Sequence, residues 1–367
     1  MSKIIENTSL SDNRPPHRAN LIANDDITEI LWRKYVRGFL SVFAALCCSI
    51  ATVNFLINPF GLYSTRLVKT PQWNARHEKA TLMKGARCQA IILGSSHAMK
   101  ISPVEVKDLT GFQTFNAAVD MATVEDEFAL LRTAVEGNHW PLKLALVAVD
   151  PETFSANAPT DMGLKRDSEL SKYVASQFPV NFRWEAAKAL LSIEQTSVSF
   201  QTLNWIRKGA PSDHHFDVDG YLHYDLLERA KRTGKYDLTA QINSTKERIA
   251  GRYRTISALS TDRQKVFLEM LNYCQIHGIR VKIFILPLHP SIRTVLLAYR
   301  YDRLLSETVD FVRSAAQRSD ADFYNLSDLT TFQGHNDAFF DGEHIDEVNA
   351  RLITTKLLEH ERGHAVQ

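Results

Sequence analysis

Short apolar runs alternate along the chain with longer stretches in which apolar residues recur at the spacing of a helix. Each run is apolar along nearly its whole length, so both faces of the strand that it forms are expected to be buried. Strands of this kind are typical of a parallel sheet that is covered by helices on both sides. The runs predict strands at 89–94, 112–117, 142–149, 279–286 and 322–326. The pattern therefore predicts an α/β domain.

The helices expected between these strands have recognisable ends. Thr123 and Asp126 form a capping-box sequence before one of them, and Gly137 is its expected stop. Residues 151–261 break the alternation and are richer in charged and aromatic residues, so we expect them to form a helical insertion at the edge of the sheet. Helical patterns cover 103–109, 184–193, 222–232, 262–277 and 293–317, and a last one begins near residue 343.

The N-terminal part of the chain follows a different pattern. Residues 1–37 are expected to form a mostly disordered tail, because the first 30 are polar and lack apolar periodicity. Residues 38–57 carry no charge, and a stretch of about 20 such residues spans the apolar core of a bilayer. They predict an uncleaved transmembrane helix, which a linker at 58–87 joins to the domain at 88–360.

Basic residues gather on one side of this predicted span. Arg33, Lys34 and Arg37 lie directly before it, whereas the first basic residues on its other side are more distant. Positive charge favours the cytoplasmic side of a membrane. We therefore expect a single-pass protein with a cytoplasmic N-terminus and an extracytoplasmic domain.

Composition and charge argue against some classes of function but do not identify an activity. The chain has 367 residues, and Lys+Arg 43 against Asp+Glu 42 gives a formal net charge of +1, which leaves no electrostatic footprint for nucleic acid. The four cysteines do not have the spacing of a metal site. Cys88 and Cys274 lie in apolar stretches, where buried thiols are expected in preference to a disulfide.

Two short motifs contain residues suited to catalysis. Ser96 lies on the strand-to-helix turn that follows the first predicted strand, where a serine serves either as a nucleophile or as a helix N-cap. Asp341 and His344 are three residues apart before the last helix. That spacing suits either an aspartate that orients a basic histidine or an aspartate that caps the helix.

Taken together, Gly94-Ser95-Ser96 and the Asp-x-x-His at 341–344 resemble the SGNH (GDSL-like) hydrolase superfamily over residues 88–360. The resemblance implies a three-layer α/β/α, flavodoxin-like parallel sheet. It also implies that Ser96 is the nucleophile, that His344 is the general base and that Asp341 orients it. Ser95 stands where the family usually has an aspartate.

The resemblance also points to the residues expected around an oxyanion. Asn116 begins the second family block, and Met121 stands at about the place of its glycine. Asp150 stands where the third block normally has an asparagine, although an ionised aspartate donates no hydrogen bond. His289, at the end of the fourth predicted strand, is a further candidate for the cleft.

With a membrane anchor, the pattern is similar to SGNH-like proteins that acylate envelope polymers, such as those of alginate O-acetylation. The resemblance implies an extracytoplasmic serine esterase or O-acyltransferase in the bacterial inner membrane, acting on acyl groups of an envelope polysaccharide without a cofactor. Its expected partners are the acylated polymer or acyl donor and proteins of the polymer machinery. The alternative is a non-catalytic component that binds polymer in the same cleft.

One further stretch resembles a metal site. Residues 213–223 contain His214, His215 and His223 among aspartates. A calcium loop aligned on Gly220 would need its first ligand at His215 and its twelfth at residue 226, which is a leucine, so that match fails. Zinc remains an alternative, but a polar loop over the edge of the sheet is preferred, and no metal is predicted.

Overall fold

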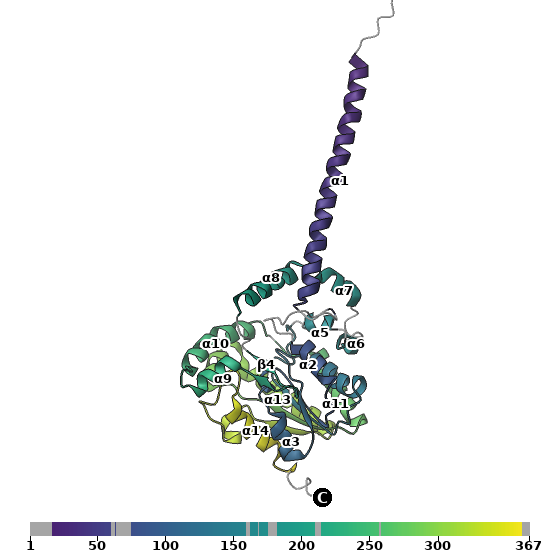
Figure 1. The fold of residues 1–367 in the computed structure, drawn as a ribbon. Coiled ribbons are helices and arrows are strands. Elements are labelled where there is room, and N and C mark those ends of the chain that lie inside the picture. The colour runs from purple at the N-terminus through teal and green to yellow at the C-terminus, as the bar shows by residue number, and fades with distance from the viewer. Residues whose placement is uncertain are drawn as a thin grey trace, which may run out of the picture.

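The computed structural model describes residues 17–59, 63, 75–158, 162–167, 169–174, 182–209, 214–256 and 258–361. A long helix, α1, projects from an α/β domain, and α3 and α14 lie on the side of that domain away from it (Figure 1). The prediction of an α/β domain with a parallel sheet is confirmed.

The sheet has five parallel strands in the order β2-β1-β3-β6-β7. The strands are β1 (Ala90–Leu93), β2 (Thr114–Asn116), β3 (Leu144–Val149), β6 (Arg280–Ile285) and β7 (Asp322–Asn325). Each of them lies inside one of the predicted runs. Every residue of β1 and β3 is buried, as their apolar sequences require, whereas β7 is a partly exposed edge.

Helices pack against the sheet in two groups. The helix α3 (Pro103–Thr110) contacts β2 and α14 (Glu347–Leu358), whereas α4 (Val124–Arg132) contacts β1 and α11 (Thr261–Ile276). The chain crosses the sheet in one direction through α3 and in the other through α4. Right-handed crossovers then place these two helices on opposite faces. The sheet is therefore covered on both sides.

The remaining helices close the second half of the domain. The predicted helix at 293–317 is divided in the structure, because Arg300 adopts a left-handed conformation that breaks the helix. Phe267 of α11 packs edge-on against Phe154, which lies just after β3. The helices of this second half are α12 (Pro290–Leu296), η3 (Leu297–Tyr299), α13 (Tyr301–Arg318) and η4 (Leu329–Phe332).

The capping box before α4 is confirmed. The Asp126 carboxylate accepts a hydrogen bond of 2.9 Å from the backbone N–H of Thr123. It also accepts one of 2.7 Å from Arg76 Nε, in a buried pair. Beyond Arg132 the helix widens into a π-type turn, η2 (Thr133–Gly137), which ends at the predicted glycine.

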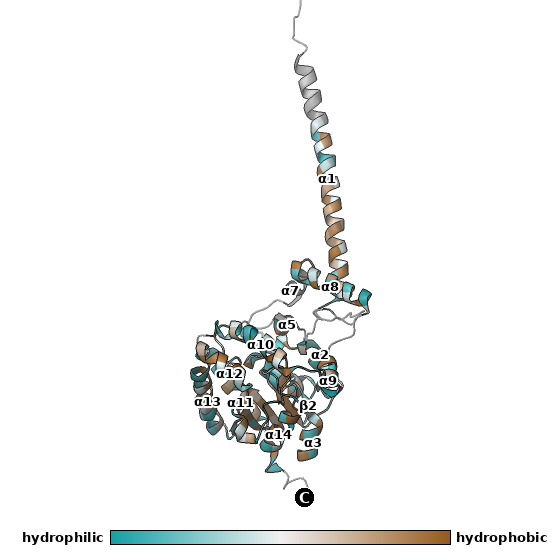
Figure 2. Cartoon of the chain, turned by 90° about the vertical axis from the view of Figure 1, so that its left-hand side faces the viewer, coloured by the Kyte–Doolittle hydropathy of each residue, from teal (hydrophilic) through white to brown (hydrophobic). Residues whose placement is uncertain are grey.

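The helix α1 (His17–Ile57) has 41 residues, and its part Thr28–Ile57 is long and apolar enough to cross a membrane. Apolar residues dominate its second half, which lies free of the domain except at its last turns (Figure 2). From His17 onward the predicted tail is helical rather than disordered, because adding residues to an existing helix costs far less than nucleating one. Residues 1–16 lie outside the described part of the chain.

The predicted linker also contains a helix, α2 (Ala75–Met83). Its Lys79 is fully buried, and its ammonium group donates to the backbone carbonyls of Asn116 and Gly220. Burial lowers the pKa of Lys79 well below its ordinary value, against the attraction of Asp219. The segment before the sheet is therefore partly built into the domain; residues 60–62 and 64–74 lie outside the described part.

Cys88 and Cys274 are buried free thiols, as the sequence indicated. Burial raises the pKa of Cys88 to about 11 and that of Cys274 to about 12. Thiols of this kind stay protonated at neutral pH and act as small apolar side chains.

The insertion between β3 and α11 is mostly helical, as predicted, but it also contains a β-hairpin. Its helices are α5 (Met162–Arg166), α6 (Ser171–Val174), α7 (Phe182–Ala189), α8 (Ile193–Lys208), α9 (Asp225–Arg232) and α10 (Leu238–Tyr253). The hairpin strands are β4 (His215–Phe216) and β5 (Leu222–His223). The predicted polar loop at 213–223 is therefore an ordered hairpin from His215 to His223.

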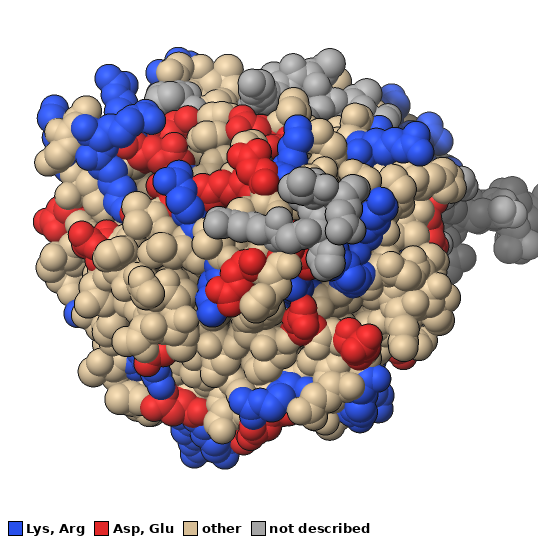
Figure 3. Space-filling model, turned by 90° about the horizontal axis from the view of Figure 1, so that it is seen from below, with Lys and Arg blue, Asp and Glu red and all other residues tan. Residues whose placement is uncertain are grey.

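The face of the domain that points away from α1 carries acidic and basic side chains in alternation (Figure 3). No single sign dominates the part of that face that is described, in keeping with the formal net charge of +1.

Candidate functional site

The carboxyl ends of β1 and β3 define the site. The chain leaves β1 toward β2 on one side and then crosses to β3 on the other, and open α/β sheets bind ligands at such a reversal. Gly94 follows β1 with φ +144°, and a Cβ atom there would lie 2.8 Å from Cβ of Ala148. Only glycine lets the chain turn so close to β3. The turn that follows, η1 (Ser96–Ala98), is partly open to solvent at Ser96.

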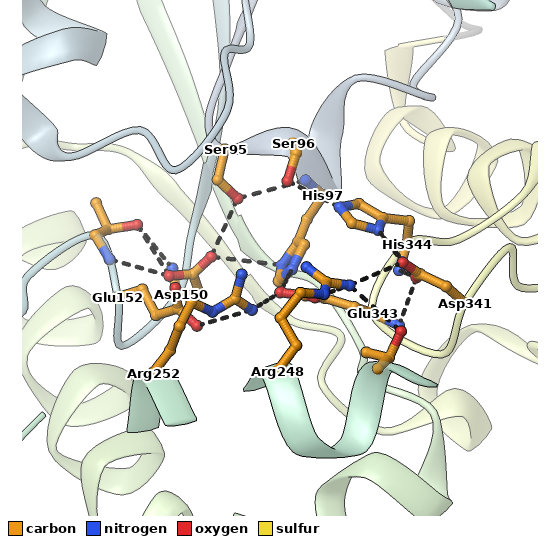
Figure 4. A network of polar contacts seen from close by, with 12 residues as sticks. Ser95, Ser96, His97, Asp150, Glu152, Arg248, Arg252, Asp341, Glu343 and His344 are labelled. Atoms are coloured by element: carbon orange, nitrogen blue, oxygen red, sulfur yellow. Dashed lines mark hydrogen bonds and ion pairs between the residues drawn. The ribbon is translucent and has the colours of Figure 1, made fainter. Parts of the chain in front are cut away.

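Ser96, His344 and Asp341 form a continuous hydrogen-bonded chain (Figure 4). Ser96 Oγ lies 2.9 Å from Nε2 of His344. Nδ1 of the same imidazole lies 2.9 Å from Oδ1 and 3.0 Å from Oδ2 of Asp341. Asp341 also accepts the backbone N–H of His344 at 2.9 Å, which fixes the turn between them. The structure thus joins two motifs that lie 248 residues apart.

Neighbouring residues perform the capping roles that were alternatives for Ser96 and Asp341. Ser95 is the N-cap of η1 and accepts from the backbone N–H of His97. Asp346 caps α14, which starts at Glu347 rather than near residue 343. Ser96 therefore does not cap η1 and Asp341 does not cap α14, and the side chains of both contact His344.

The Asp341 carboxylate is held in its ionised form. Burial alone would raise its pKa, but the charge and hydrogen bonds of His344, together with Arg248, lower the pKa to about 2. Because the folded pKa lies below the ordinary 3.8, this group stabilises the fold above about pH 4, and that contribution is lost as the pH falls toward 2. At neutral pH the imidazole therefore faces a full negative charge.

A second set of polar side chains lies next to these three residues (Figure 4). Ser95 Oγ donates to Asp150 at 3.2 Å, and Nδ1 of His97 lies 3.5 Å from the same carboxylate. Nε2 of His97 lies 3.5 Å from Glu343, and its ring meets that of His344 edge-on at 5.5 Å. His97 thus links the ends of β1 and β3 to the turn that holds His344.

Arginines from the insertion complete this network. Nη2 of Arg248 on α10 lies 3.2 Å from carboxylate oxygens of both Asp341 and Glu343. Arg252, one helical turn further on, pairs with Glu343 and lies 3.5 Å from Glu152. These two arginines are not predicted from the sequence, where their only signal is the i, i+4 spacing on a helix of the insertion.

The side chains of Asn116 and Asp150 are engaged in other contacts. Asn116 is fully buried and donates both amide hydrogens at 2.9 Å, to the carbonyls of Ala98 and Ile101. Asp150 accepts from Ser95 and from the backbone N–H of Thr153. Neither side chain is placed to donate to a bound oxygen.

Met121 has the backbone conformation expected of a glycine. Its φ is +46°, which costs a non-glycine residue about 1–2 kcal/mol, and its side chain is 55% exposed. The resemblance implies a glycine at about this position, and glycine adopts such a positive φ without strain. In the described part of the chain, the backbone N–H groups of Met121 and Ser96 have no acceptor.

His289 lies behind the turn that holds Asp341. It is the N-cap of α12, and its ring meets that of Phe339 edge-on at 5.4 Å. Its backbone N–H donates to the carbonyl of Gly342 at 2.8 Å. Burial lowers its pKa. His289 thus supports the 341–344 turn, and no contact joins it to Ser96.

Two groups of side chains in the described residues have donor atoms close enough to hold a metal ion. One consists of Asp341, Glu343 and His344, but Arg248 and Arg252 already place positive charge against its carboxylates. The other consists of His215, Asp217 and His223 on the β4–β5 hairpin, where no arginine pair competes.

No protein-family model matches the chain, and no curated protein matches it.

Proposed function

We propose that the protein is a membrane-anchored serine esterase or O-acyltransferase of the SGNH type, acting outside the cytoplasm on acyl groups of an envelope polysaccharide. The observation that carries the proposal is the chain of hydrogen bonds from Ser96 through His344 to Asp341. A serine hydroxyl needs such an oriented base, because it is hardly ionised at neutral pH.

The topology supports the same assignment. In sequence order the strands follow the 2-1-3-4-5 arrangement of flavodoxin-like sheets, whose ligands bind at the β1/β3 reversal. Ser96 follows the first strand and lies at that reversal, and the Asp-x-x-His turn comes directly before the last helix. These are the positions that the resemblance to SGNH hydrolases implies.

The geometry supports a two-step acyl transfer. Ser96 Oγ attacks the ester carbonyl while Nε2 of His344 takes its proton, and Asp341 balances the imidazolium charge. The backbone N–H groups of Ser96 and Met121 donate to the oxyanion. As the tetrahedral intermediate collapses, the bond to the leaving alcohol breaks and His344 returns the proton to it. An acyl ester on Ser96 remains.

The second step repeats the first with a new nucleophile. His344 deprotonates water or a sugar hydroxyl, which attacks the acyl carbonyl. Collapse releases the acid or the newly acylated sugar, and the proton on His344 returns to Ser96 Oγ. The same residues therefore support hydrolysis and transfer, and the acceptor decides which product forms.

A fluorophosphonate probe tests the nucleophile directly. We expect the purified full-length protein to form one covalent adduct, and peptide mapping to place it on Ser96, because the probe reacts only with a serine that a base activates. A serine hydrolase of known activity serves as the positive control. The catalytic proposal fails if the probe modifies that control but not this protein, or if it modifies a peptide without Ser96. The remaining function is then the alternative one, binding of polymer in the cleft.

We further propose that Thr28–Ile57 anchors the protein in the bacterial inner membrane and that α8 lies on the outer surface of the bilayer. Asn54, near the end of α1, donates to the carbonyl of Leu190 and to Thr196 Oγ1, both at 2.8 Å. These bonds hold α8 across the last turns of α1 (Figure 1).

The distribution of side chains on α8 reverses that of an ordinary surface helix. Gln195, Ser199 and Thr202 are fully buried, whereas Ile193 is 89% and Phe200 60% exposed. Apolar side chains on the open face of a helix next to a membrane span fit the boundary between lipid head groups and acyl chains. Arg207 and Lys208 at the end of α8 suit anionic lipids.

Spin labels test the position of α8 in full-length protein reconstituted into lipid nanodiscs, after Cys47 and Cys48 are replaced by alanine. A label on Phe200→Cys is expected to collide more with lipid-soluble oxygen than with a water-soluble nickel chelate. The matched control is Val104→Cys on α3, which is 58% exposed and lies on the side of the domain away from α1 (Figure 1).

A third label separates the two parts of this proposal. A label on Phe43→Cys, within the proposed span, reports whether α1 is in the bilayer. If it is in lipid while the label at 200 is as water-accessible as the label at 104, the contact of α8 with lipid is excluded. The open face of α8 is then a surface for a protein partner.

A further inference from the structure

The β4–β5 hairpin brings two histidines and an aspartate together on the surface of the insertion. His215 and His223 are directly opposite each other in the antiparallel pair, and their rings stack at 4.7 Å. Asp217 follows β4 in the turn between them. The three side chains are half-buried or exposed, so an ion can reach them from solvent.

The donor atoms of these side chains lie on the same side of the hairpin. Nε2 of His223 is 2.9 Å from Oδ2 of Asp217, and Nε2 of His215 is 3.8 Å from Oδ1. All three donors lie within 4.8 Å of one another. Tetrahedral zinc with bonds of about 2.0–2.1 Å requires donors roughly 3.3 Å apart. The donor separations, at most 4.8 Å, must therefore shorten by up to about 1.5 Å when an ion binds.

The other nitrogen of each imidazole is held by a second carboxylate. Nδ1 of His215 lies 2.8 Å from Asp225, and Nδ1 of His223 lies 3.4 Å from Glu228. Both carboxylates belong to α9, and Glu228 is itself fixed by Lys100 at 2.9 Å. A histidine that donates from Nδ1 to a carboxylate presents the Nε2 lone pair to a metal, which is the usual environment of a zinc-binding histidine.

The hairpin is also fixed in place before any ion binds. The carbonyl of Asp219 accepts a 2.8 Å hydrogen bond from the backbone N–H of Asn116 at the end of β2. Gly220 has φ +80°, and a Cβ atom there would lie only 2.2 Å from the Asn116 carbonyl oxygen. The Lys79 ammonium group donates to the backbone carbonyls of Asn116 and Gly220 at this junction. An ordered hairpin loses little entropy when it binds an ion.

We propose that His215, Asp217 and His223 form a zinc site, with water at the fourth position. The ligand set of two imidazoles and one carboxylate suits Zn²⁺ better than Ca²⁺ or Mg²⁺, which prefer oxygen donors alone. Asp217 and His223 also line a cavity of about 290 Å³, in which Lys100 and Arg351 are paired with carboxylates. An ion bound by these residues is therefore open to this cavity.

The ion would also brace the edge of the proposed active site. Tyr224 directly follows His223, and its ring lies 6.4 Å from that of His344. The site does not share a ligand with the Ser96–His344–Asp341 chain, so the zinc proposal stands or fails independently of the proposed catalysis.

Zinc titration of full-length, tag-free protein that has been treated with chelator tests this proposal. We expect one Zn²⁺ per chain by calorimetry, a rise in melting temperature with Zn²⁺, and the visible absorption of a tetrahedral site with Co²⁺. The double variant His215→Ala/His223→Ala should lose all three signals. Asp225→Asn, which leaves the three ligands in place, should weaken zinc binding about 10- to 100-fold.

The matched control is His277→Ala/His360→Ala, which removes two exposed histidines from other parts of the domain. This variant should bind zinc as the wild type does. Asp217→Asn keeps the shape of the hairpin, so a loss of zinc binding in this variant cannot be attributed to misfolding. If the wild-type protein binds no zinc, or if the His215/His223 double variant binds it with unchanged affinity, the proposal is overturned.

Discussion

Replacing Ser96 with alanine is expected to lower kcat/KM for p-nitrophenyl acetate hydrolysis by about 10⁴-fold. The hydroxyl 2.9 Å from Nε2 of His344 is the only described side chain that bonds to that nitrogen, so no second nucleophile replaces it. Steady-state kinetics of the full-length protein in detergent measures the loss. The small side chain leaves the turn intact, because Ser95 rather than Ser96 caps it.

Ser95→Ala is the matched control. It removes a neighbouring hydroxyl of the same size, together with its 3.2 Å bond to Asp150, but leaves the Ser96–His344 contact in place. We expect this variant to retain most of the activity. If Ser96→Ala is as active as the wild type, Ser96 is not the nucleophile. If Ser95→Ala is inactive while Ser96→Ala is active, the role belongs to Ser95.

Asp341→Asn should lower kcat by roughly 10³- to 10⁴-fold while leaving the structure of the turn nearly unchanged. The amide is close in shape to the carboxylate, but it carries no charge to balance the imidazolium, and it favours the wrong tautomer of His344. The wild-type carboxylate has a pKa of about 2, so it is ionised throughout the pH range of an esterase assay. The defect should therefore persist at every pH from 5 to 9.

An aspartate-to-asparagine change away from the site distinguishes the effect of the charge on Asp341 from the effect of a change in net charge. Asp337→Asn alters an exposed aspartate just upstream in the same segment, and we expect it to have no effect on kcat. Thermal unfolding of both variants should show intact domains. If Asp341→Asn keeps nearly full kcat across the pH range, Asp341 does not orient the base.

The sheet could be predicted from the sequence, because each of its strands lies within one of the predicted runs, although β7 is a partly exposed edge. The local cap before α4 was also predictable, since Thr123 and Asp126 are only three residues apart. The β4–β5 hairpin could not be predicted from the sequence. Its strands have only two residues each, and charged residues lie close to them in the sequence. Such a hairpin is stabilised by contacts with Asn116 and Lys79, which lie far away in the sequence.

The motif residues of the candidate site could be predicted from the sequence, but the residues that surround them could not. Ser96, Asp341 and His344 belong to short motifs, so their proximity followed from the expected topology. Arg248 and Arg252 come from a helix whose place over the site depends on how the whole insertion packs. The division of roles between Ser95 and Ser96 was equally hidden, because it depends on which adjacent hydroxyl faces the helical turn.

Ser96 and His344 are far apart in the sequence, and their separation bears on the order in which the site is assembled. A contact between residues 248 positions apart closes a very large loop, and such contacts form after the local ones. If the domain is exported in sequence order after the anchor helix, Ser96 emerges long before α10 and His344. A chain that ends after β7 would retain all five strands of the sheet but lack the base for its serine. Under the proposed function, an exported chain would therefore be inactive until the segment that carries His344 is in place.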